Sequence, residues 1–354
     1  MQLNRQGRVM GWDIGGAHLK ACLIDAQGAV RQGWQLPCPV WQGLPVLQQA
    51  LHSVLQQVPA ACLEQCQHAV TMTAELVDLF DDRQQGVVQI SQLLHGLIPH
   101  CQFFSAQGNF VAYAQVAQHS QQIASANWLA SGLWLAQSHR DALLIDIGST
   151  TSDFILLLDG KVANTGLDDA SRLSNHELLY SGVVRTPLMA LAPSIRWAGK
   201  SSNVAAEYFA TTADIYRITG ELSAHDDVAD TADGKDKSVL ASQRRVARMV
   251  GADLSSLSSA QCLALAQAFK AAQLQLLQEN LHGLVQRLAI APSLPLLGMG
   301  AGHFLVAQLA ELERRAYFPV SKLITAPQPE LQYYAMVCLP AYAVAALLAK
   351  EISH

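Results

Sequence analysis

The sequence predicts an α/β protein made of two related halves, and three glycine-containing turns are the main reason. Residues 143–156 form an apolar run that ends in Asp146, turns through one glycine and three hydroxyl residues, and resumes as a second apolar run. Residues 9–25 repeat this pattern around Asp13. Residues 296–302 form a glycine-rich turn at the end of a third apolar run. Two apolar runs joined by a short polar turn are typical of a β-hairpin. We therefore expect one acid-bearing hairpin in each half and a late glycine-rich turn.

Length and composition agree with this class. The chain has 354 residues, of which 51% are hydrophobic and 14% are charged, so two domains with well-filled cores are expected. The net charge of −5 argues against nucleic-acid binding. The seven scattered cysteines are typical of a reducing compartment, so we expect a cytoplasmic protein. The apolar run at residues 335–349 contains Pro340 and is too short for a membrane span, so no membrane partner is expected.

The first domain is expected at residues 1–138. Leu44, Leu47, Leu51 and Val54 share one face of a helix, and the other elements follow from apolar runs and turn residues. The predicted order is three strands at 9–14, 19–25 and 29–36, a helix at 44–58, a strand at 69–73, a helix at 90–97, a strand at 101–105 and a long helix at 110–136. Three strands followed by helix–strand alternation predict a mixed sheet.

The second domain is expected at residues 139–354, with an insertion at about 167–257 that shows little periodicity. Within the insertion, Ser242 is expected to cap a basic helical turn. After the hairpin and a strand at 161–165, the predicted elements outside the insertion are a helix at 263–288, the turn at 298–302, a helix from 303, a strand at 323–326 and a helix from 329. The acidic loop at 225–236 does not have the spacing of a calcium loop, and the sequence assigns it no role.

The turns suit a phosphate with its magnesium ion, because backbone amides and hydroxyls can face phosphate oxygens while an acid holds the metal. The candidate metal ligands are Asp13 and Asp146. The candidate phosphate-binding residues are Gly15, Gly16, Gly148, Ser149, Thr150 and Thr151, with Gly298, Gly300 and Gly302 closing on the ligand. Arg185, Arg244 and Arg248 are candidates for gripping a diphosphate or a carboxylate, because a guanidinium matches both groups in a bidentate manner. We also consider that Arg244 and Arg248, four apart, simply form a solvated helix face.

Two acid-bearing hairpins followed by a Gly-x-Gly-Ala-Gly turn resemble the actin, sugar-kinase and Hsp70 (ASKHA) superfamily. That resemblance implies two RNase-H-like halves around a central phosphate-binding cleft. Residues 146–153 are also similar to the second acidic hairpin of the hydantoinase/oxoprolinase-related group. Within that group, the chain resembles proteins linked to tetrahydromethanopterin-dependent one-carbon transfer, through stretches at 72–76, 126–130, 180–187, 206–210, 231–234 and 245–249.

The archaeal members of this family are similar to the methanofuran-precursor synthase. The resemblance implies a Mg²⁺-dependent transferase that joins a furan-methanol diphosphate to the phenol of a glutamylated acceptor and releases diphosphate. Such a reaction needs a base for the phenol, whose pKa is about 10. The candidates are Glu75, His18, Asp153 and Glu177, although His18 also suits an ordinary polar turn. Small-molecule substrates are the expected partners, and the sequence sets neither the oligomeric state nor the choice between a tyramine-based and a tyrosine-based acceptor.

Two other functions stay open. The first is an ATP-dependent hydantoinase- or oxoprolinase-like hydrolase, or a small-molecule kinase, with ATP or ADP in the same turns. The second is a non-catalytic nucleotide-binding protein. Gly15 and Gly16 are followed by Ala17 and not by the hydroxyl residues usual in ATP-using relatives, which argues against the kinase.

Overall fold

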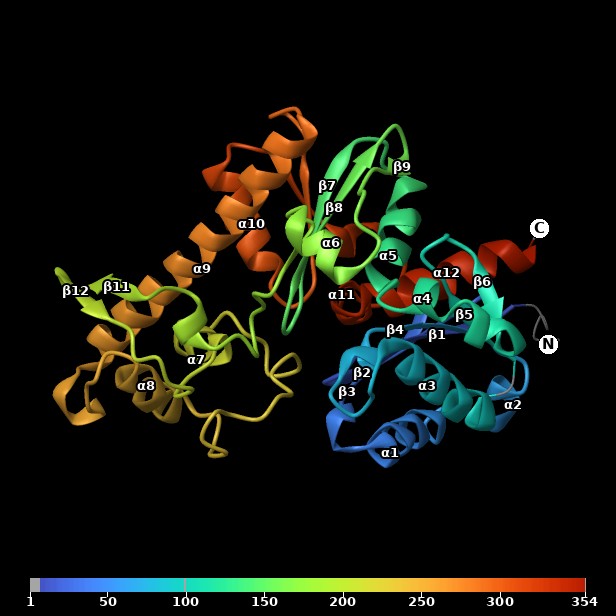
Figure 1. The fold of residues 1–354 in the computed structure, drawn as a ribbon, viewed down its shortest axis with the longest axis horizontal. Helices are drawn as coiled ribbons and strands as arrows, with labels where there is room; N and C mark the ends of the chain where they lie inside the picture. Colours follow the sequence, from blue (N-terminus) through green and yellow to red (C-terminus); the bar gives the residue numbers. More distant parts are fainter. Residues whose placement is uncertain (1–6, 99, 354) are drawn as a thin grey trace. The chain divides into compact units, whose positions relative to one another are not determined.

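The computed structural model describes residues 7–98 and 100–353. The first six residues of the expected first domain and the last residue of the second lie outside this description. The chain forms two compact units (Figure 1). Unit 1 comprises Met1–Ala142, Ile155–Ser171 and Val320–His354, and unit 2 comprises Leu143–Phe154 and Arg172–Pro319.

Unit 1 is built on a six-stranded sheet in the order β3-β2-β1-β4-β5-β6. β1 is antiparallel to β2 and parallel to β4. Its strands are β1 (Val9–Ile14), β2 (His18–Ile24), β3 (Val30–Pro37), β4 (Gln67–Met72), β5 (Cys101–Phe104) and β6 (Phe110–Ala112). Its helices are α1 (Leu44–Leu55), α2 (Ala60–Leu63), α3 (Arg83–Leu97), α4 (Ser120–Ile123), α5 (Asn127–Ala136), α11 (Pro329–Val337) and α12 (Leu339–Ser353), with the short 3-10 helices η1 (Val40–Gln42), η2 (Ala74–Leu76), η3 (Tyr113–Gln118) and η6 (Val320–Leu323).

Helices cover both faces of this sheet, with α1 and α3 on one face and α12 on the other (Figure 1). α12 approaches β1 so closely that a Cβ atom on Gly11 would lie 1.8 Å from the carbonyl oxygen of Ala341. Only glycine fits there. Because α12 is buried against β1, β2 and β4, the end of the chain belongs to unit 1. The compact units therefore have other boundaries than the expected domains at 1–138 and 139–354.

Unit 2 carries a second sheet in the order β10-β8-β7-β13-β14. Its strands are β7 (Ala142–Ile147), β8 (Ser152–Leu158), β10 (Leu178–Leu179), β13 (Leu296–Met299) and β14 (Tyr317–Pro319), and the end of β8 pairs with β9 (Lys161–Val162) within unit 1. A separate hairpin, α7–α10 and two 3-10 helices complete it: β11 (Ser194–Trp197), β12 (Lys200–Asn203), α7 (Thr212–Thr219), α8 (Val239–Arg248), α9 (Ser259–Leu288), α10 (His303–Leu312), η4 (Leu188–Ala190) and η5 (Leu254–Ser256). α6 (Asp169–Ser174) begins in unit 1 and ends in unit 2.

The two sheets share one plan. The order β2-β1-β4-β5 in the first sheet corresponds to the order β8-β7-β13-β14 in the second. In both, the first strand of the hairpin is parallel to a later strand, and that strand is parallel to the next one. The repeat predicted for the hairpins therefore extends to the whole strand order of the two sheets. Asp13 and Asp146 occupy corresponding positions near the ends of β1 and β7.

Several predicted elements were wrong. Residues 110–136 are not one long helix but β6, η3, α4 and α5 in succession. Residues 323–326 are not a strand, since η6 ends at Leu323 and β14 lies before it. The cap of α8 is Ser238, whose hydroxyl accepts from the Ala241 amide, and not Ser242, which is buried inside the helix. The insertion is also more regular than expected, because it contains α7 and α8.

Among residues 7–98 and 100–353, no single helix is both long and apolar enough to cross a membrane, and α11 and α12 meet the criteria only as a pair bent by 97°.

Candidate functional site

The turn between β7 and β8 is clamped by a segment that lies about 35 residues further along the chain. The amides of Val184 and Arg185 donate to the Ser149 carbonyl oxygen at 3.1 and 2.9 Å, and the Val183 amide donates to the Gly148 carbonyl oxygen at 3.0 Å. The carbonyl oxygens of Gly148 and Ser149 are thus held by hydrogen bonds from outside the turn.

The amides of the same turn are left available. Within the part of the chain that the structure describes, the N–H groups of Ser149, Thr150 and Thr151 have no hydrogen-bond acceptor. The Ser149 hydroxyl oxygen is buried and has no partner among those residues either. These three residues are partly exposed. Successive free amides in a tight turn form a concave site for an anion.

The turn between β1 and β2 repeats this arrangement within unit 1. The Gly16 and Ala17 carbonyl oxygens accept hydrogen bonds from the Val40 and Cys38 amides at 2.9 and 2.8 Å. The amides of Gly16 and Ala17 have no acceptor among the described residues. Each unit therefore has one turn in which two carbonyl oxygens accept hydrogen bonds from a later segment and successive amides have no acceptor among the described residues.

A close backbone contact supports the clamp. A Cβ atom on Gly182 would lie 2.5 Å from the Ser149 carbonyl group and the Thr150 nitrogen, so no larger residue fits there. The Gly182 amide donates to the Thr186 hydroxyl at 2.8 Å. The Gly182 carbonyl oxygen accepts from the Gln273 side chain on α9 at 2.9 Å. A buried polar network thus holds the clamp against the turn.

The late glycine turn packs directly on the Asp146 strand. Gly300 has φ +78°, and a Cβ atom on it would lie 2.3 Å from the Asp146 Oδ1 atom. The Gly302 amide donates to the Ile147 carbonyl oxygen at 2.8 Å. A Cβ atom on Gly298 would instead meet the ring of Tyr317 at 2.6 Å, so this glycine serves packing.

In unit 1, Asp13 lies on β1 in register with Lys20 on β2 and Thr71 on β4, so the three side chains share one face of the sheet. Asp13 and Thr71 are both buried. The Thr71 hydroxyl has no hydrogen-bond partner among the described residues, and the Lys20 ammonium donates to the Val337 carbonyl oxygen at 3.0 Å. Lys20 and Thr71 carry no turn signal, so sequence reasoning did not select them.

Glu75 is fully buried in η2, where the Ser125 hydroxyl donates to its Oε1 atom at 3.0 Å. Burial raises the pKa of Glu75 to about 7. Its backbone packs against Gly86, at which a Cβ atom would lie 2.7 Å from the Glu75 carbonyl oxygen. His18, the other candidate base in unit 1, is buried at the start of β2.

The two candidate bases of unit 2 are paired with arginines. Asp153 lies 2.8 Å from the Arg172 guanidinium, which is buried. Glu177 is completely buried and lies 2.6 Å from the Arg287 guanidinium. Both carboxylates are occupied by these arginines, so the two acids suit a structural role.

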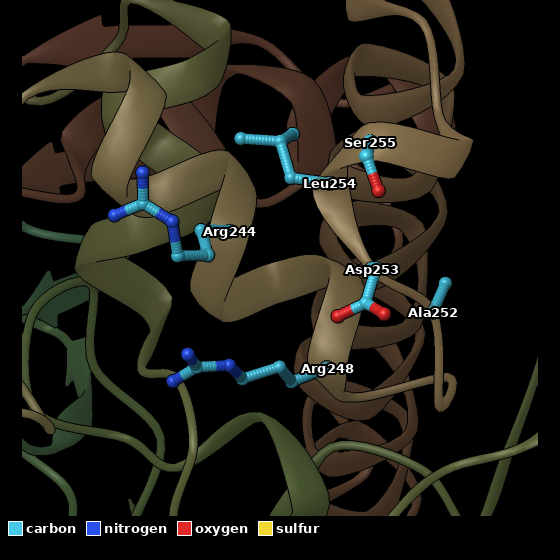
Figure 2. Close-up of a pocket in the computed structure, with 6 residues that line it drawn as sticks. All are labelled: Arg244, Arg248, Ala252, Asp253, Leu254 and Ser255. Atoms are coloured by element: carbon cyan, nitrogen blue, oxygen red, sulfur yellow. The ribbon is translucent and has the colours of Figure 1, made fainter.

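The three candidate arginines do not lie together on one element. Arg185 belongs to the clamp, where its Nη1 atom donates to the Thr150 hydroxyl at 3.4 Å and burial lowers the pKa of its guanidinium. Arg244 and Arg248 lie on α8 and line a cavity of about 230 Å³ together with Ala252, Asp253, Leu254 and Ser255 (Figure 2).

The acidic loop has a structural role that sequence reasoning missed. Asp233 lies 2.9 Å from Arg245, and Asp227 accepts hydrogen bonds from the Nε and Nη2 atoms of Arg217 at 2.6 and 2.7 Å. Asp214 on α7 pairs with both arginines at 2.8 Å and is completely buried. The loop therefore neutralises two arginines that anchor α7 and α8. The only signal in the sequence was the density of acids near Arg245.

Comparisons with known proteins agree with this architecture. The Hydantoinase/oxoprolinase family model matches residues 67–348. A relative from Methanocaldococcus jannaschii is 30% identical over 282 residues, covering 79% of this chain and 82% of that protein. A relative from Methanococcus vannielii is 31% identical over 216 residues, covering 60% of this chain and 93% of that protein. Both are named (4-{4-[2-(gamma-L-glutamylamino)ethyl]phenoxymethyl}furan-2-yl)methanamine synthase.

Among solved structures, nucleotide-free acetone carboxylase superposes with a TM-score of 0.57 at 10% identity, covering 96% of this chain and 70% of that chain. The predicted fold class is confirmed: the chain has the α/β fold of the actin, sugar-kinase and Hsp70 superfamily. The match over most of its length also confirms the resemblance that the sequence motifs indicated, and the chain belongs to the hydantoinase/oxoprolinase family.

Proposed function

We propose that the protein is a transferase of methanofuran-type cofactor biosynthesis, in tetrahydromethanopterin-linked one-carbon metabolism. It joins a furan-methanol diphosphate to a glutamylated phenol and releases diphosphate. The observation that carries this proposal is the clamped turn at Ser149–Thr151, whose free amides suit a phosphate group. The two synthase relatives support a biosynthetic enzyme, and their name contains the phenoxymethyl-furan ether that this reaction would form.

The reaction breaks the bond between the furan methylene carbon and the ester oxygen that joins it to the diphosphate. The electron pair leaves with the diphosphate, and the phenol oxygen forms the new bond to the methylene carbon while its proton passes to a base. The amides of Ser149, Thr150 and Thr151 would stabilise the charge that develops on the departing group. The Arg185 guanidinium, held beside Thr150, would add positive charge at the same place.

The fold family implies a magnesium ion, and the residues of the turn fit one. Among residues 7–98 and 100–353, no group of three or more His, Cys, Asp or Glu side chains is arranged to hold a metal ion. Magnesium usually takes only one or two carboxylates together with substrate phosphates and water. Asp146, partly exposed beside the amide-lined turn, provides one such carboxylate, and Asp13 is the corresponding acid of unit 1. When bound with the diphosphate, the ion would neutralise the leaving-group charge.

The proposed base is His18 or Glu75. A base that accepts a phenol proton near neutral pH works best with a pKa close to 7. Burial gives Glu75 such a value, whereas Asp153 and Glu177 are committed to arginines.

The test incubates the purified protein and Mg²⁺ with furan-methanol diphosphate and γ-glutamyltyramine, without ATP. We expect the aryl ether by mass spectrometry and one diphosphate per ether. Asp146→Asn should abolish turnover, while Asp230→Asn, which changes an exposed acid of the same unit, should leave it intact. Absence of ether with both tyramine-based and tyrosine-based acceptors would contradict the proposal.

The family match favours one second candidate, an ATP-dependent hydrolase or kinase, because the family is described as hydantoinase/oxoprolinase. ADP or orthophosphate would then form in step with product. Supplying ATP with a cyclic amide in the same assay separates the two. Tight nucleotide binding without turnover would instead indicate a nucleotide-binding protein.

A further inference from the structure

We propose that the cavity at the end of α8 binds the free α-amino-acid group of the phenolic acceptor. Arg244 and Arg248 would hold the carboxylate, and Asp253 would hold the ammonium group. The inference rests on the proposed function, because that function supplies an acceptor with a γ-glutamyl end. All residues of the cavity belong to unit 2.

The two arginines are placed as an anion site. They lie four residues apart on α8, and Figure 2 shows their side chains extending from the same side of the helix. Among the described residues, neither guanidinium has a hydrogen-bond acceptor or an ion-pair partner, whereas their neighbour Arg245 is fully paired. Like charges at this spacing repel each other and destabilise a helix. An anionic ligand would relieve that repulsion.

The opposite charge comes from the chain that follows the helix. Asp253 precedes η5 and its side chain makes no capping hydrogen bond. Asp253 lines the same cavity, and Figure 2 shows its carboxylate near the backbone end of the Arg248 side chain. Two guanidinium groups and one carboxylate around a small cavity match a group that carries a carboxylate and an ammonium on one carbon. The Ser255 hydroxyl lines the same cavity.

The size of the cavity also favours one end of a ligand. Drug-sized ligands occupy pockets of about 300–1,000 Å³. The cavity at α8 measures about 230 Å³. It therefore suits the amino-acid end of the acceptor, while the phenol lies outside it.

A short segment connects this cavity with the clamped turn. The Ala205 amide donates to the Met249 carbonyl oxygen at 2.8 Å, just after α8. Six residues later, Thr211 forms a bridge with Pro187, which follows Arg185 of the clamp by two residues. Six extended residues span at most about 20 Å, and bends at 206–209 shorten this distance.

The acceptor has a comparable reach. A γ-glutamyltyramine is about as long as four extended residues, roughly 14 Å. On the connecting segment, the exposed ring of Tyr208 lies within electrostatic reach of Arg185, which contacts Thr150. An acceptor anchored at α8 would therefore run past Tyr208 toward the turn.

Calorimetric binding of three acceptors tests the inference without any chemistry. They are γ-glutamyltyramine, 4-aminobutyryl-tyramine, which lacks only the carboxylate, and glutaryl-tyramine, which lacks only the ammonium group. Titrations are made with and without Mg²⁺ and inorganic diphosphate. We expect the parent protein to bind γ-glutamyltyramine at least tenfold more tightly than either analogue.

The variants then assign each half of the amino acid. Arg244→Ala and Arg248→Ala should weaken γ-glutamyltyramine at least tenfold and remove its advantage over the 4-aminobutyryl analogue. Asp253→Asn should remove only the advantage over the glutaryl analogue. Arg196→Ala, at an exposed arginine on β11, is the matched control and should bind like the parent.

Unchanged selectivity in the α8 variants, or a parent protein that does not bind γ-glutamyltyramine under any condition, would overturn the inference. The outcome is separate from that of the proposed reaction. If no ether forms but the selectivity pattern holds, the cavity is an amino-acid site and the reaction is wrong. If ether forms and the variants keep the parent's selectivity, the reaction stands and the cavity does not bind the acceptor.

Discussion

Gly300 lies so close to Asp146 that a Cβ atom on the glycine would be 2.3 Å from the carboxylate oxygen Oδ1. The same Cβ atom would be 2.4 Å from the Ile147 carbonyl oxygen, and φ at Gly300 is +78°. The backbone of the glycine turn therefore fixes where the Asp146 carboxylate sits. The two candidate site residues are linked by packing and not only by motif.

Gly300→Ala should displace Asp146 and lower kcat by at least about 100-fold, because a shift of about 1 Å in a catalytic group has effects of that size. Gly199→Ala is the matched control. Gly199 has φ +77°, and a Cβ atom there would meet no heavy atom within 4 Å, so this variant isolates the backbone strain. Thermal unfolding and turnover are measured for both. Equal activity in the two variants would show that Gly300 serves conformation alone.

Asp214→Asn should destabilise unit 2 by about 3–5 kcal/mol, because it removes the completely buried carboxylate that pairs with both Arg217 and Arg245. The free energy of unfolding from urea titration measures this. Asp159→Asn, which removes one partner of an exposed pair with Arg140, should have no measurable effect. A similar small effect at both positions would contradict a structural role for the buried ion pairs of Asp214.

Glu75 should make stability depend on pH. Burial raises its pKa from 4.5 to about 7, so the folded state binds the proton more tightly than the unfolded state. The free energy of unfolding should therefore fall by roughly 3 kcal/mol as pH rises from about 4.5 to about 7, at 1.36 kcal/mol per pKa unit, and flatten above that. Glu75→Gln should remove this slope. The prediction fails if urea unfolding of the variant and the parent shows the same pH dependence.

Arg185→Ala should lower kcat/KM for the diphosphate substrate at least tenfold, which corresponds to about 1.4 kcal/mol of transition-state stabilisation. The reason is its position beside Thr150 in the turn that would hold the leaving group. Arg185→Lys should recover only part of the loss, since an ammonium cannot bind two oxygens in parallel. Steady-state kinetics would speak against this role if Arg185→Ala matched the Arg196→Ala control.

Much of the fold was readable from the sequence because its central signals are local. Both hairpins consist of apolar runs interrupted by a short turn, and the glycines that pack on Asp146 follow their strand directly. Residues 110–136 were misread because their apolar content suits a helix, while contacts with β5 make their first three residues a strand. Periodicity does not report such tertiary preferences.

The candidate site was less readable, because its decisive contacts join distant residues. Val184 and Arg185 contact residues of a turn that lie at least 35 positions before them in the chain. The separation between Thr150 and Arg185 is 35 positions. Ser125 reaches Glu75 across 50 positions. The sequence selected Arg185 and Glu75 by residue type, but the clamp and the burial that define their chemistry required the folded chain.

The position of bond cleavage tests the central claim most directly. The substrate is furan-methanol diphosphate that carries ¹⁸O between the methylene carbon and phosphorus. It is incubated with protein, Mg²⁺ and γ-glutamyltyramine, and the label in each product is measured by mass spectrometry. We predict that all the label leaves with diphosphate and that the ether oxygen comes from the phenol. Label retained on the furan carbon, or label-free diphosphate, would mean cleavage at phosphorus, and the assignment of this protein as an ether-forming transferase would be wrong.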